Sequence, residues 1–401
     1  MKVLDFVSRI SISKYLRHGR KIKAVNTMSL PSKQFVWLDW LRFSAAFIVL
    51  LTHARGVAFV EYGALSANDQ NPLTMLWFAM TRLGHEAVIV FFVLSGFLVG
   101  GKLAERVAAG SFAWRDYIVD RTSRVMVPLV PAIVLSVFVG FLVGERYSIL
   151  QIIGNLLSLQ GIFVSPLQVN APLWSLSYEV WFYVLAGSIG TIAVGQRSAA
   201  LARIVAILSL AVFLKLAAVY LFCWLLGALA YHQPLRRFSV TQTILALAIV
   251  GAALIGSQIT SGTQSITMPV WLVLYLDRAL VEFMLAAGIA LLVRNLCTIS
   301  EPSQTMSSFG RTGSWLASFS YTLYLVHYPM LYIIEELGFV RETEITPESL
   351  SYFGLMVVTC LLASYGFYWL FERRTANVRR WLRKRLSSPQ VGSEMPRSQV
   401  Q

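Results

Sequence analysis

The chain has 401 residues, of which 56% are hydrophobic and 13% are charged, whereas charged residues make up about a quarter of an average soluble domain. Apolar runs close to the ~20 residues that cross a bilayer recur between Phe35 and Phe371. An ordinary soluble protein is therefore excluded. The three cysteines, Cys223, Cys297 and Cys360, lie in or beside apolar runs, so we expect neither a disulfide framework nor a zinc site.

The net charge of +14 is concentrated in six segments. These hold 27 of the 34 Lys and Arg residues and cover 1–34, 101–125, 195–203, 233–239, 294–313 and 372–401. Basic loops of membrane proteins face the cytoplasm. The pattern therefore predicts a membrane protein with both termini in the cytoplasm and an even number of crossings, and it argues against nucleic acid as the partner of this charge.

The apolar runs and the basic loops together predict an all-α fold, a polytopic membrane bundle of about ten transmembrane helices. The predicted spans lie near 35–54, 87–101, 125–144, 174–194, 201–216, 219–232, 241–257, 271–293, 314–336 and 351–371. The run 149–164 is short and interrupted by polar residues, so we expect a re-entrant or interfacial segment there. It stays open whether the runs 201–216 and 219–232 each cross the membrane. If they form one tilted helix instead, the number of crossings is no longer even.

Three parts of the chain follow from this prediction. Residues 1–34 form a basic cytoplasmic N-terminal segment, 35–372 a transmembrane domain, and 373–401 a basic cytoplasmic tail whose end, from Ser387, has a disordered composition. The first apolar run is not a signal peptide, because Arg42 interrupts it and no convincing cleavage site follows. We expect a multi-pass protein of the cell membrane.

Ionisable residues inside a membrane helix are costly and often functional, and the first predicted helix carries Asp39, Arg42 and His53. Asp39 and Arg42 are three residues apart and can pair across one turn. Arg42 and His53 are eleven residues apart, so they share one face and lie about 16 Å apart along the axis. This spacing predicts a charged stripe on the inner side of the helix. The alternative is that these residues only anchor the two helix ends.

Two further polar pairs flank the second and third predicted helices. His85 and Glu86 stand at the outer entrance of the second helix, at the level of His53. Arg121 and Arg124 lie three residues apart just before the third helix, where two guanidinium groups on one face suit a phosphate. Anchoring of anionic lipid headgroups is an equally open alternative for the arginine pair.

Later runs carry more intramembrane polar residues. Glu179 lies about five residues inside the fourth apolar run, where a carboxylate must be protonated, paired or beside water. The nearby Trp174 and Tyr178 fit an interfacial aromatic belt. Arg278 and Glu282 stand four residues apart in the eighth run and can neutralise each other.

Five motifs follow one another along the chain. They are Arg42, ten residues and His53, preceded by Asp39; FFVLSGF from Phe91 to Phe97; Arg121-x-x-Arg124; WSLSYE from Trp174 to Glu179; and SYTLYLVHYP from Ser320 to Pro329. In this order they resemble the membrane-bound acyltransferase 3 family, whose members O-acylate sugars and related acceptors. The resemblance spans Phe35 to Glu372. It departs before the FF pair, where Ala87-Val88-Ile89 stands in place of the frequent Gly-Val-Asp and lacks its carboxylate.

The resemblance implies transfer of an acyl group, in the simplest case acetyl, from cytoplasmic acyl-CoA to a carbohydrate hydroxyl, without a metal. It makes His53 the general base, a role that suits an imidazole. Arg42 and Asp39 are then further catalytic residues on the same helix. Glu179 is expected to orient His53 or the acceptor hydroxyl.

The donor and the acceptor are assigned to different residues in this prediction. Arg121 and Arg124 hold the phosphates of acyl-CoA. The acceptor is expected to contact His85, Glu86, Trp174, Ser177, Tyr178 and His327. Exopolysaccharide, O-antigen and lipid-linked sugars are acceptors in the family, and the bacterial inner membrane is the expected location. The sequence names neither the acceptor nor the acyl group.

A membrane transporter of an anionic or acylated solute is the alternative function. The pairs Asp39–Arg42 and Arg278–Glu282 would then act as gates, although the two halves of the chain show no inverted repeat of hydropathy. A non-catalytic scaffold has no need of His53 or of the arginine pair. The expected partners are therefore membrane lipid, acyl-CoA and a carbohydrate acceptor, and no nucleic acid.

Overall fold

The computed structural model describes residues 33–196, 198–232, 237–260, 278–299, 301–302 and 307–386, most of which are helical. The helices are α3 (Val36–Ala58), α4 (Pro72–Thr81), α5 (Gly84–Ser95), α6 (Lys102–Ala108), α7 (Trp114–Leu142), α8 (Ile149–Leu156), α9 (Trp174–Ala193), α10 (Ala199–Lys215), α11 (Val219–His232), α12 (Val240–Thr260), α14 (Arg278–Leu296), α15 (Ser308–Ser318), α16 (Ser320–Glu336), α17 (Pro347–Leu370) and α18 (Thr375–Leu386). Short helical turns are η1 (Tyr62–Ala64), the π-helical η2 (Gly96–Gly101), η3 (Gln168–Leu173) and η4 (Glu372–Arg374). Two-residue strands β1 (Lys33–Gln34) and β2 (Glu301–Pro302) pair antiparallel.

Six helical segments of the described residues are long and apolar enough to cross a bilayer. They are Val36–Ala58, Pro72–Ala108, Trp114–Leu142, Val240–Thr260, Arg278–Leu296 and Pro347–Leu386. The predicted spans near 174–194, 201–216, 219–232 and 314–336 coincide with helices that are shorter or less apolar. The all-α membrane architecture thus holds, while the number of ten crossings stays a prediction.

Several boundaries differ from the predicted ones. The predicted span 87–101 is only part of a helical segment that already begins at Pro72, because Asn71 caps α4 by accepting hydrogen bonds from the N–H groups of Leu73 and Thr74. The predicted span 314–336 is broken between α15 and α16 at Phe319, whose φ and ψ of −111° and 5° are not helical. Residues 271–277 of the eighth predicted span lie outside the described residues, as do residues 1–32 and 387–401 of the predicted tails.

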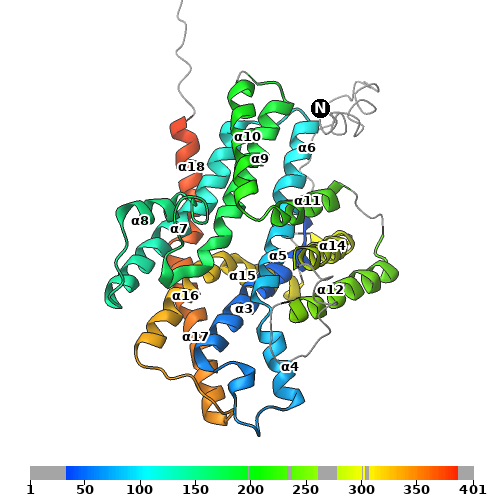
Figure 1. The fold of residues 1–401 in the computed structure, drawn as a ribbon. Helices are drawn as coiled ribbons and strands as arrows, with labels where there is room; N and C mark the ends of the chain where they lie inside the picture. Colours follow the sequence, from blue (N-terminus) through cyan, green and yellow to red (C-terminus); the bar gives the residue numbers. More distant parts are fainter. Residues whose placement is uncertain are drawn as a thin grey trace, which may run out of the picture.

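The two doubtful regions of the sequence have clear structures. The stretch 149–164 contains only the eight residues of α8 as helix, about 12 Å at 1.5 Å per residue, which is too short for a ~30 Å hydrocarbon core. Runs 201–216 and 219–232 form two separate helices, because Leu216 is extended and ends α10. Figure 1 shows α11 turning away from α10 at a large angle.

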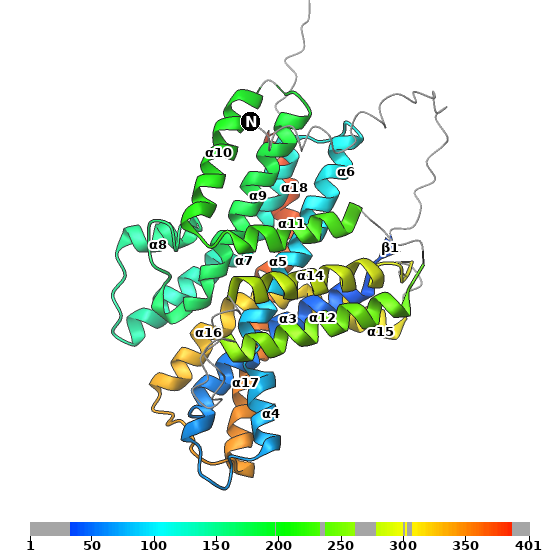
Figure 2. The same ribbon diagram turned by 45° about the vertical axis from the view of Figure 1, so that its right-hand side comes forward.

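Three of the six basic segments have described parts that lie at one end of the molecule. Figures 1 and 2 show α6, α18 and the turn between α9 and α10 at this end, and the connections from α3 to α4 and from α16 to α17 at the other. This arrangement agrees with the charge pattern of the sequence. The side of the membrane on which the basic end lies remains a prediction.

The predicted basic tail is partly a packed helix. Asp120 of α7 forms ion pairs with Arg383 and Arg379 of α18 at 2.8 and 3.5 Å, and Asp116 pairs with Arg383 at 3.3 Å. These contacts hold α18 along the first turns of α7. The strongly basic composition of the tail does not predict this packing, because the carboxylates that pair with it, Asp116 and Asp120, lie far away in the sequence.

Candidate active site

A cavity of about 300 Å³ lies inside the bundle where α3, α5, α7, α9 and α16 meet. Much of its wall consists of valine, leucine and phenylalanine side chains. Its charged lining residues are Arg42, Lys102, Arg121, Arg124 and Glu179. Four cations and one carboxylate thus line the cavity among the described residues, so its field attracts anions.

The arginines of the cavity are held in different ways. Arg42 pairs with Asp39 of the preceding turn, with 3.6 Å between Nη1 and Oδ1, as the sequence spacing predicts. Arg121 lies over the rings of Tyr117 and Tyr183, with its Cζ 6.0 and 5.5 Å from their centroids. Its Nε is buried and has no hydrogen-bond partner within the described ranges. A buried donor without a partner is costly, so an anionic ligand oxygen suits this position.

Two more cations complete the basic wall. Arg124 lies inside the bundle yet is accessible to water, because it faces the cavity. Lys102 begins α6, directly after the π-helical turn η2, and lines the same cavity. Lys102 is not among the predicted site residues, because it lies in the basic segment 101–125, which the charge pattern indicates as a loop. Its position directly after an apolar run was the one local feature that indicated a place inside the bundle.

Glu179 faces the cavity and not the first-helix histidine. Its carboxylate accepts a hydrogen bond from the hydroxyl of Tyr183, one turn later on α9, and both residues line the cavity. The hydrogen-bond partner of His53 is His327. Of the two roles that the sequence left open for Glu179, orienting His53 or the acceptor hydroxyl, the first has no contact in the structure, and the residue in contact with His53 lies on α16.

A pair of histidines lies at the contact between α3 and α16. Nδ1 of His53 is 3.0 Å from Nε2 of His327, and the two rings are stacked with centroids 5.1 Å apart. Nδ1 of His327 is 2.9 Å from the carbonyl oxygen of Leu323, one turn earlier. His327 is fully buried. The sequence-based prediction is that His327 contacts the acceptor, and in the structure its ring lies against that of His53.

Pro329 explains how α16 is fixed at this depth. A proline has no N–H, so the carbonyl of Leu325, four residues earlier, is left without its helical partner. That carbonyl accepts a hydrogen bond from Nδ2 of Asn170 at 3.0 Å, and the same amide nitrogen donates to Oγ of Ser136. Asn170, in η3 just before α9, therefore links α16 to α7 next to His327.

Tyr324 stands between the cavity and the histidine pair. It lines the cavity, and its ring centroid is 6.0 Å from that of His327. Its hydroxyl donates to the Pro172 carbonyl at 2.6 Å and is 2.6 Å from Oγ of Ser175. One helical turn therefore separates the cavity wall from His327.

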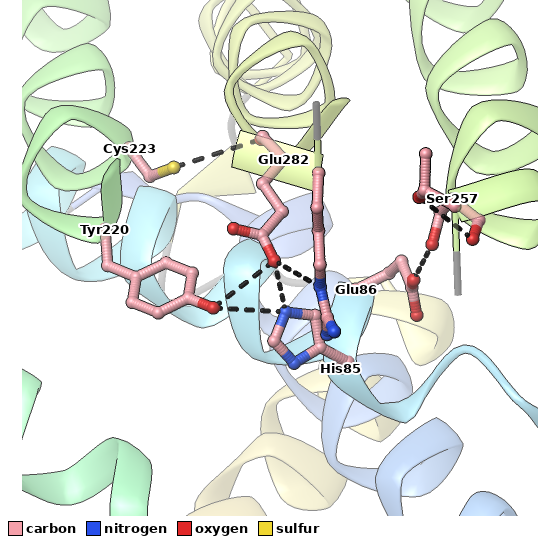
Figure 3. A network of polar contacts seen from close by, with 8 residues as sticks. His85, Glu86, Tyr220, Cys223, Ser257 and Glu282 are labelled. Carbon is pink, nitrogen blue, oxygen red and sulfur yellow. Dashed lines mark hydrogen bonds and ion pairs between the residues drawn. The ribbon is translucent and has the colours of Figure 1, made fainter. Parts of the chain in front are cut away.

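A second polar network joins α5, α11 and α14 (Figure 3). Nε2 of His85 is 2.7 Å from Oε1 of Glu282, which also accepts from Nε of Arg278 at 3.1 Å and from the Tyr220 hydroxyl at 3.3 Å. The Arg278–Glu282 pair is the one that the sequence spacing predicts. Cys223 donates its thiol to the Glu282 backbone carbonyl at 3.9 Å.

The acceptor residues expected from the sequence partly meet in this network. The ring of Trp174 stacks on His85, with centroids 5.7 Å apart and planes inclined by 14°. Glu86 accepts a hydrogen bond from Ser257 of α12 (Figure 3), and it lines one small pocket with His85 and Glu282. His85 and Trp174 are thus side by side, and Glu86 lies next to His85 at this pocket.

Ser177 and Tyr178 have structural contacts instead. The Ser177 side chain is fully buried, and its hydroxyl is 2.8 Å from the carbonyls of Gln160 and Trp174. The Tyr178 hydroxyl accepts the N–H of Ala217 at 3.0 Å, which fixes the break between α10 and α11. The polar atoms of both residues are therefore occupied in holding α9 to its neighbours.

The sequence analysis also missed Glu372, at the end of α17. Its Oε2 accepts hydrogen bonds from the hydroxyl and the N–H of Thr322 at 2.5 and 3.3 Å. Thr322 is buried on α16, next to Tyr321 of the cavity wall. Glu372 thus fixes the first turn of α16, and only its place at the end of an apolar run marked it.

The chain matches one family model over most of its length. That model describes the acyltransferase domain of the acyltransferase 3 family, and the match covers residues 35–369. No curated protein and no solved structure matches the chain. The matched range contains the cavity, the histidine pair and the network around Glu282. The chain belongs to the acyltransferase 3 family and is a multi-pass membrane acyltransferase.

Proposed function

We propose that this protein transfers an acyl group, in the simplest case acetyl, from acyl-CoA to a hydroxyl of a carbohydrate. The acceptor is an exopolysaccharide, an O-antigen or a lipid-linked sugar, and the bacterial inner membrane is the proposed location. The observation that carries this proposal is the basic cavity that ends one helical turn from a pair of histidines.

The donor is proposed to enter from the basic end of the molecule. Its phosphates lie against Arg121, Arg124 and Lys102, since charge-assisted hydrogen bonds to guanidinium groups are strong and directional. The cavity volume of about 300 Å³ is at the lower limit for ligand pockets, so part of the donor lies outside it. The apolar wall then receives the acyl-bearing arm.

His53 is proposed as the general base. A sugar hydroxyl is a poor nucleophile, and an imidazole can remove its proton as the oxygen attacks the thioester carbonyl. The resulting tetrahedral species collapses by breaking the carbon–sulfur bond, and the protonated His53 returns the proton to the departing CoA thiolate. Free CoA and an O-acylated sugar are the products.

Two further residues of the cavity and one beside it support donor binding. Arg42 lies about 16 Å from His53 along α3, too far to contact the same thioester oxygen, so it is proposed to bind the negatively charged donor in the cavity. Asp39, beside the cavity, holds the guanidinium of Arg42 by an ion pair. Glu179 is proposed to balance the arginines and to keep the Tyr183 hydroxyl turned along the cavity wall.

The acceptor is proposed to bind beside His85 and Trp174. A stacked aromatic pair offers an apolar face to a sugar ring, and the carboxylate of Glu282 is a hydrogen-bond acceptor for its hydroxyls. Glu86 lies on the same helix, at the edge of this region. Ser177 and Tyr178 are not proposed to bind the acceptor, because their hydroxyl groups already form hydrogen bonds that hold α9 to its neighbours.

Incubation of the purified protein with isotopically labelled acetyl-CoA and total envelope glycans tests this function. Mass spectrometry is expected to find the label as an ester on a carbohydrate, and none with the variant Arg121→Gln/Arg124→Gln. Label found only in water-soluble acetate, or equal labelling with the variant, would contradict the proposal. Uptake of label into vesicles without any ester would favour a transporter.

A further inference from the structure

The hydrogen-bond chain at the histidine pair fixes the position of its protons. A carbonyl oxygen can only accept a hydrogen bond, so Nδ1 of His327, 2.9 Å from the Leu323 oxygen, carries a proton. Nε2 of the same ring is 3.0 Å from Nδ1 of His53. Whether this second nitrogen carries a proton decides which of the two rings donates the hydrogen bond between them.

His327 is neutral in this surrounding. Its side chain has no exposed surface, and the partners of its ring within the described ranges are the backbone of Leu323 and Tyr324 and the ring of His53, none of which is an anion. A second proton would therefore bury a cation without a counterion, which is unfavourable. With Nδ1 protonated and the ring neutral, Nε2 has a lone pair and accepts. Nδ1 of His53 is then the donor.

We propose that His327 is a positioning residue, which holds His53 in the Nδ1–H form and so leaves the lone pair of His53 on Nε2. The hydrogen bond on one ring nitrogen sets the proton on the other. This inference rests on the proposed function, in which His53 is the general base, and it names the atom that accepts the proton of the acceptor hydroxyl.

The arrangement also stabilises the protonated base. After Nε2 of His53 has taken the hydroxyl proton, its Nδ1–H donates from a cation to a neutral acceptor, and such charge-assisted hydrogen bonds are shorter and stronger. The Nδ1 proton stays in place, while the proton on Nε2 goes on to the CoA thiolate. His327 gains and loses no proton in the cycle.

The neighbouring rings keep this geometry. The ring of Tyr328 meets that of His53 edge to face, with centroids 5.0 Å apart, and Cys360 donates its thiol to the backbone carbonyl of His327 at 3.7 Å. The first contact restricts rotation of the His53 ring, and the second ties α17 to the backbone of α16. The orientation of His53 thus comes from α16 and from its own helix, where the backbone of Val49 also contacts its ring.

Nitrogen-15 NMR of the full-length protein in detergent, labelled at histidine, tests the proton positions directly. The chain has five histidines, and the His53 signals are identified by their loss in His53→Ala. We expect a protonated Nδ1 and an unprotonated Nε2 on His53. The opposite form overturns the inference. This measurement needs no turnover, so it separates a failure of the inference from a failure of the proposed function.

Two variants test the consequence for catalysis. His327→Leu removes the acceptor, and we expect kcat to fall by roughly 10²-fold with the KM of donor and acceptor changed by less than about twofold. His327→Gln keeps an oxygen that accepts from Nδ1 of His53, and we expect it to recover at least about tenfold of that loss. Equal kcat values for the two variants would overturn the inference, and so would a His327→Leu protein as fast as the wild type. Donor binding, expected to be unchanged, shows that the variants are folded.

Discussion

Gly84 of α5 lies against Thr52 of α3, so closely that a methyl group added to the glycine would be 2.8 Å from Oγ1 of Thr52. The threonine cannot turn away easily, because it is β-branched and its hydroxyl donates to the Ile48 carbonyl at 3.0 Å. Thr52 precedes His53, and Gly84 precedes His85. This contact therefore sets the spacing between the proposed base and the proposed acceptor site.

The substitution Gly84→Ala is expected to push α5 away from α3. Overpacking of this kind costs about 1–3 kcal/mol, and the displacement of His85 from His53 should lower acyl transfer by roughly 10–10²-fold. Thermal unfolding and initial rates in detergent measure the two effects. Gly354→Ala on α17 is the matched control, because nothing lies within 4 Å of its added methyl group. Full activity of Gly84→Ala would show that the spacing is not critical.

The double variant Arg121→Gln/Arg124→Gln is expected to bind the CoA donor more weakly, since each charge-assisted hydrogen bond contributes about 1.5–3 kcal/mol. Lysine at both positions should restore only part of the affinity, because an ammonium keeps the charge but loses the planar fork. Titration of donor binding, in detergent free of anionic lipid, measures both.

The control for this titration is Arg341→Gln, which removes a cation that pairs with Glu335 at 2.8 Å outside the cavity. It should leave donor affinity unchanged. Unchanged affinity in the double Gln variant would remove the phosphate-binding role. Complete recovery with lysine would point to anchoring of lipid headgroups instead.

Asp69 makes the contact between the loop before α4 and the loop before α17 depend on pH. Hydrogen bonds from the Ile345 N–H at 2.9 Å and the Ser66 hydroxyl at 2.7 Å hold the pKa of its carboxyl below the ordinary value. Because the pKa of Asp69 is lower in the folded protein, its ionised carboxylate stabilises the fold at pH values above the unfolded pKa of about 3.9. This stabilisation is lost as the pH falls through the folded pKa.

The variant Asp69→Asn has no such ionisation. The difference in Tm between wild type and Asp69→Asn should therefore be largest above about pH 5 and should shrink as the pH falls below about 4. Thermal unfolding of both proteins over this range measures it. A difference that does not change with pH would mean that the charge of Asp69 contributes nothing to the loop contact.

The predicted topology places the turn before α10 in the cytoplasm. Ser198 lies in this turn, at the end of the molecule that α6 and α18 share (Figure 1). In a variant without the native cysteines, Ser198→Cys should react with a membrane-impermeant thiol reagent only after the cells are opened. Gly63→Cys in η1, at the opposite end, should react in intact cells. Labelling of Ser198→Cys from outside would refute the ten-helix topology.

The contacts that the sequence predicts are the local ones. Asp39 with Arg42 and Arg278 with Glu282 are three and four residues apart, and helix geometry alone brings such residues together. The membrane character follows equally directly from the apolar runs. Both features depend only on the regular rise and turn of a helix.

The contacts that the sequence does not predict depend on which helices pack together. His53 and His327 are 274 residues apart, and no spacing rule relates them. The expected partner, Glu179, is instead turned towards the arginines by its own neighbour Tyr183. The break at Phe319 was missed for a different reason, because the run continues across it and no proline or glycine lies next to it to mark a helix end.

The central claim is that the imidazole of His53 removes the proton of the acceptor hydroxyl. Measurement of kcat for His53→Ala in detergent, with labelled acetyl-CoA and a saturating acceptor, tests it most directly. The control is His232→Ala, at the end of α11, whose ring contacts Tyr231. The account predicts a loss of ~10²–10⁴-fold in kcat for His53→Ala with unchanged donor binding, and near-normal turnover for His232→Ala. A His53→Ala protein that turns over at a rate close to the wild type would contradict it.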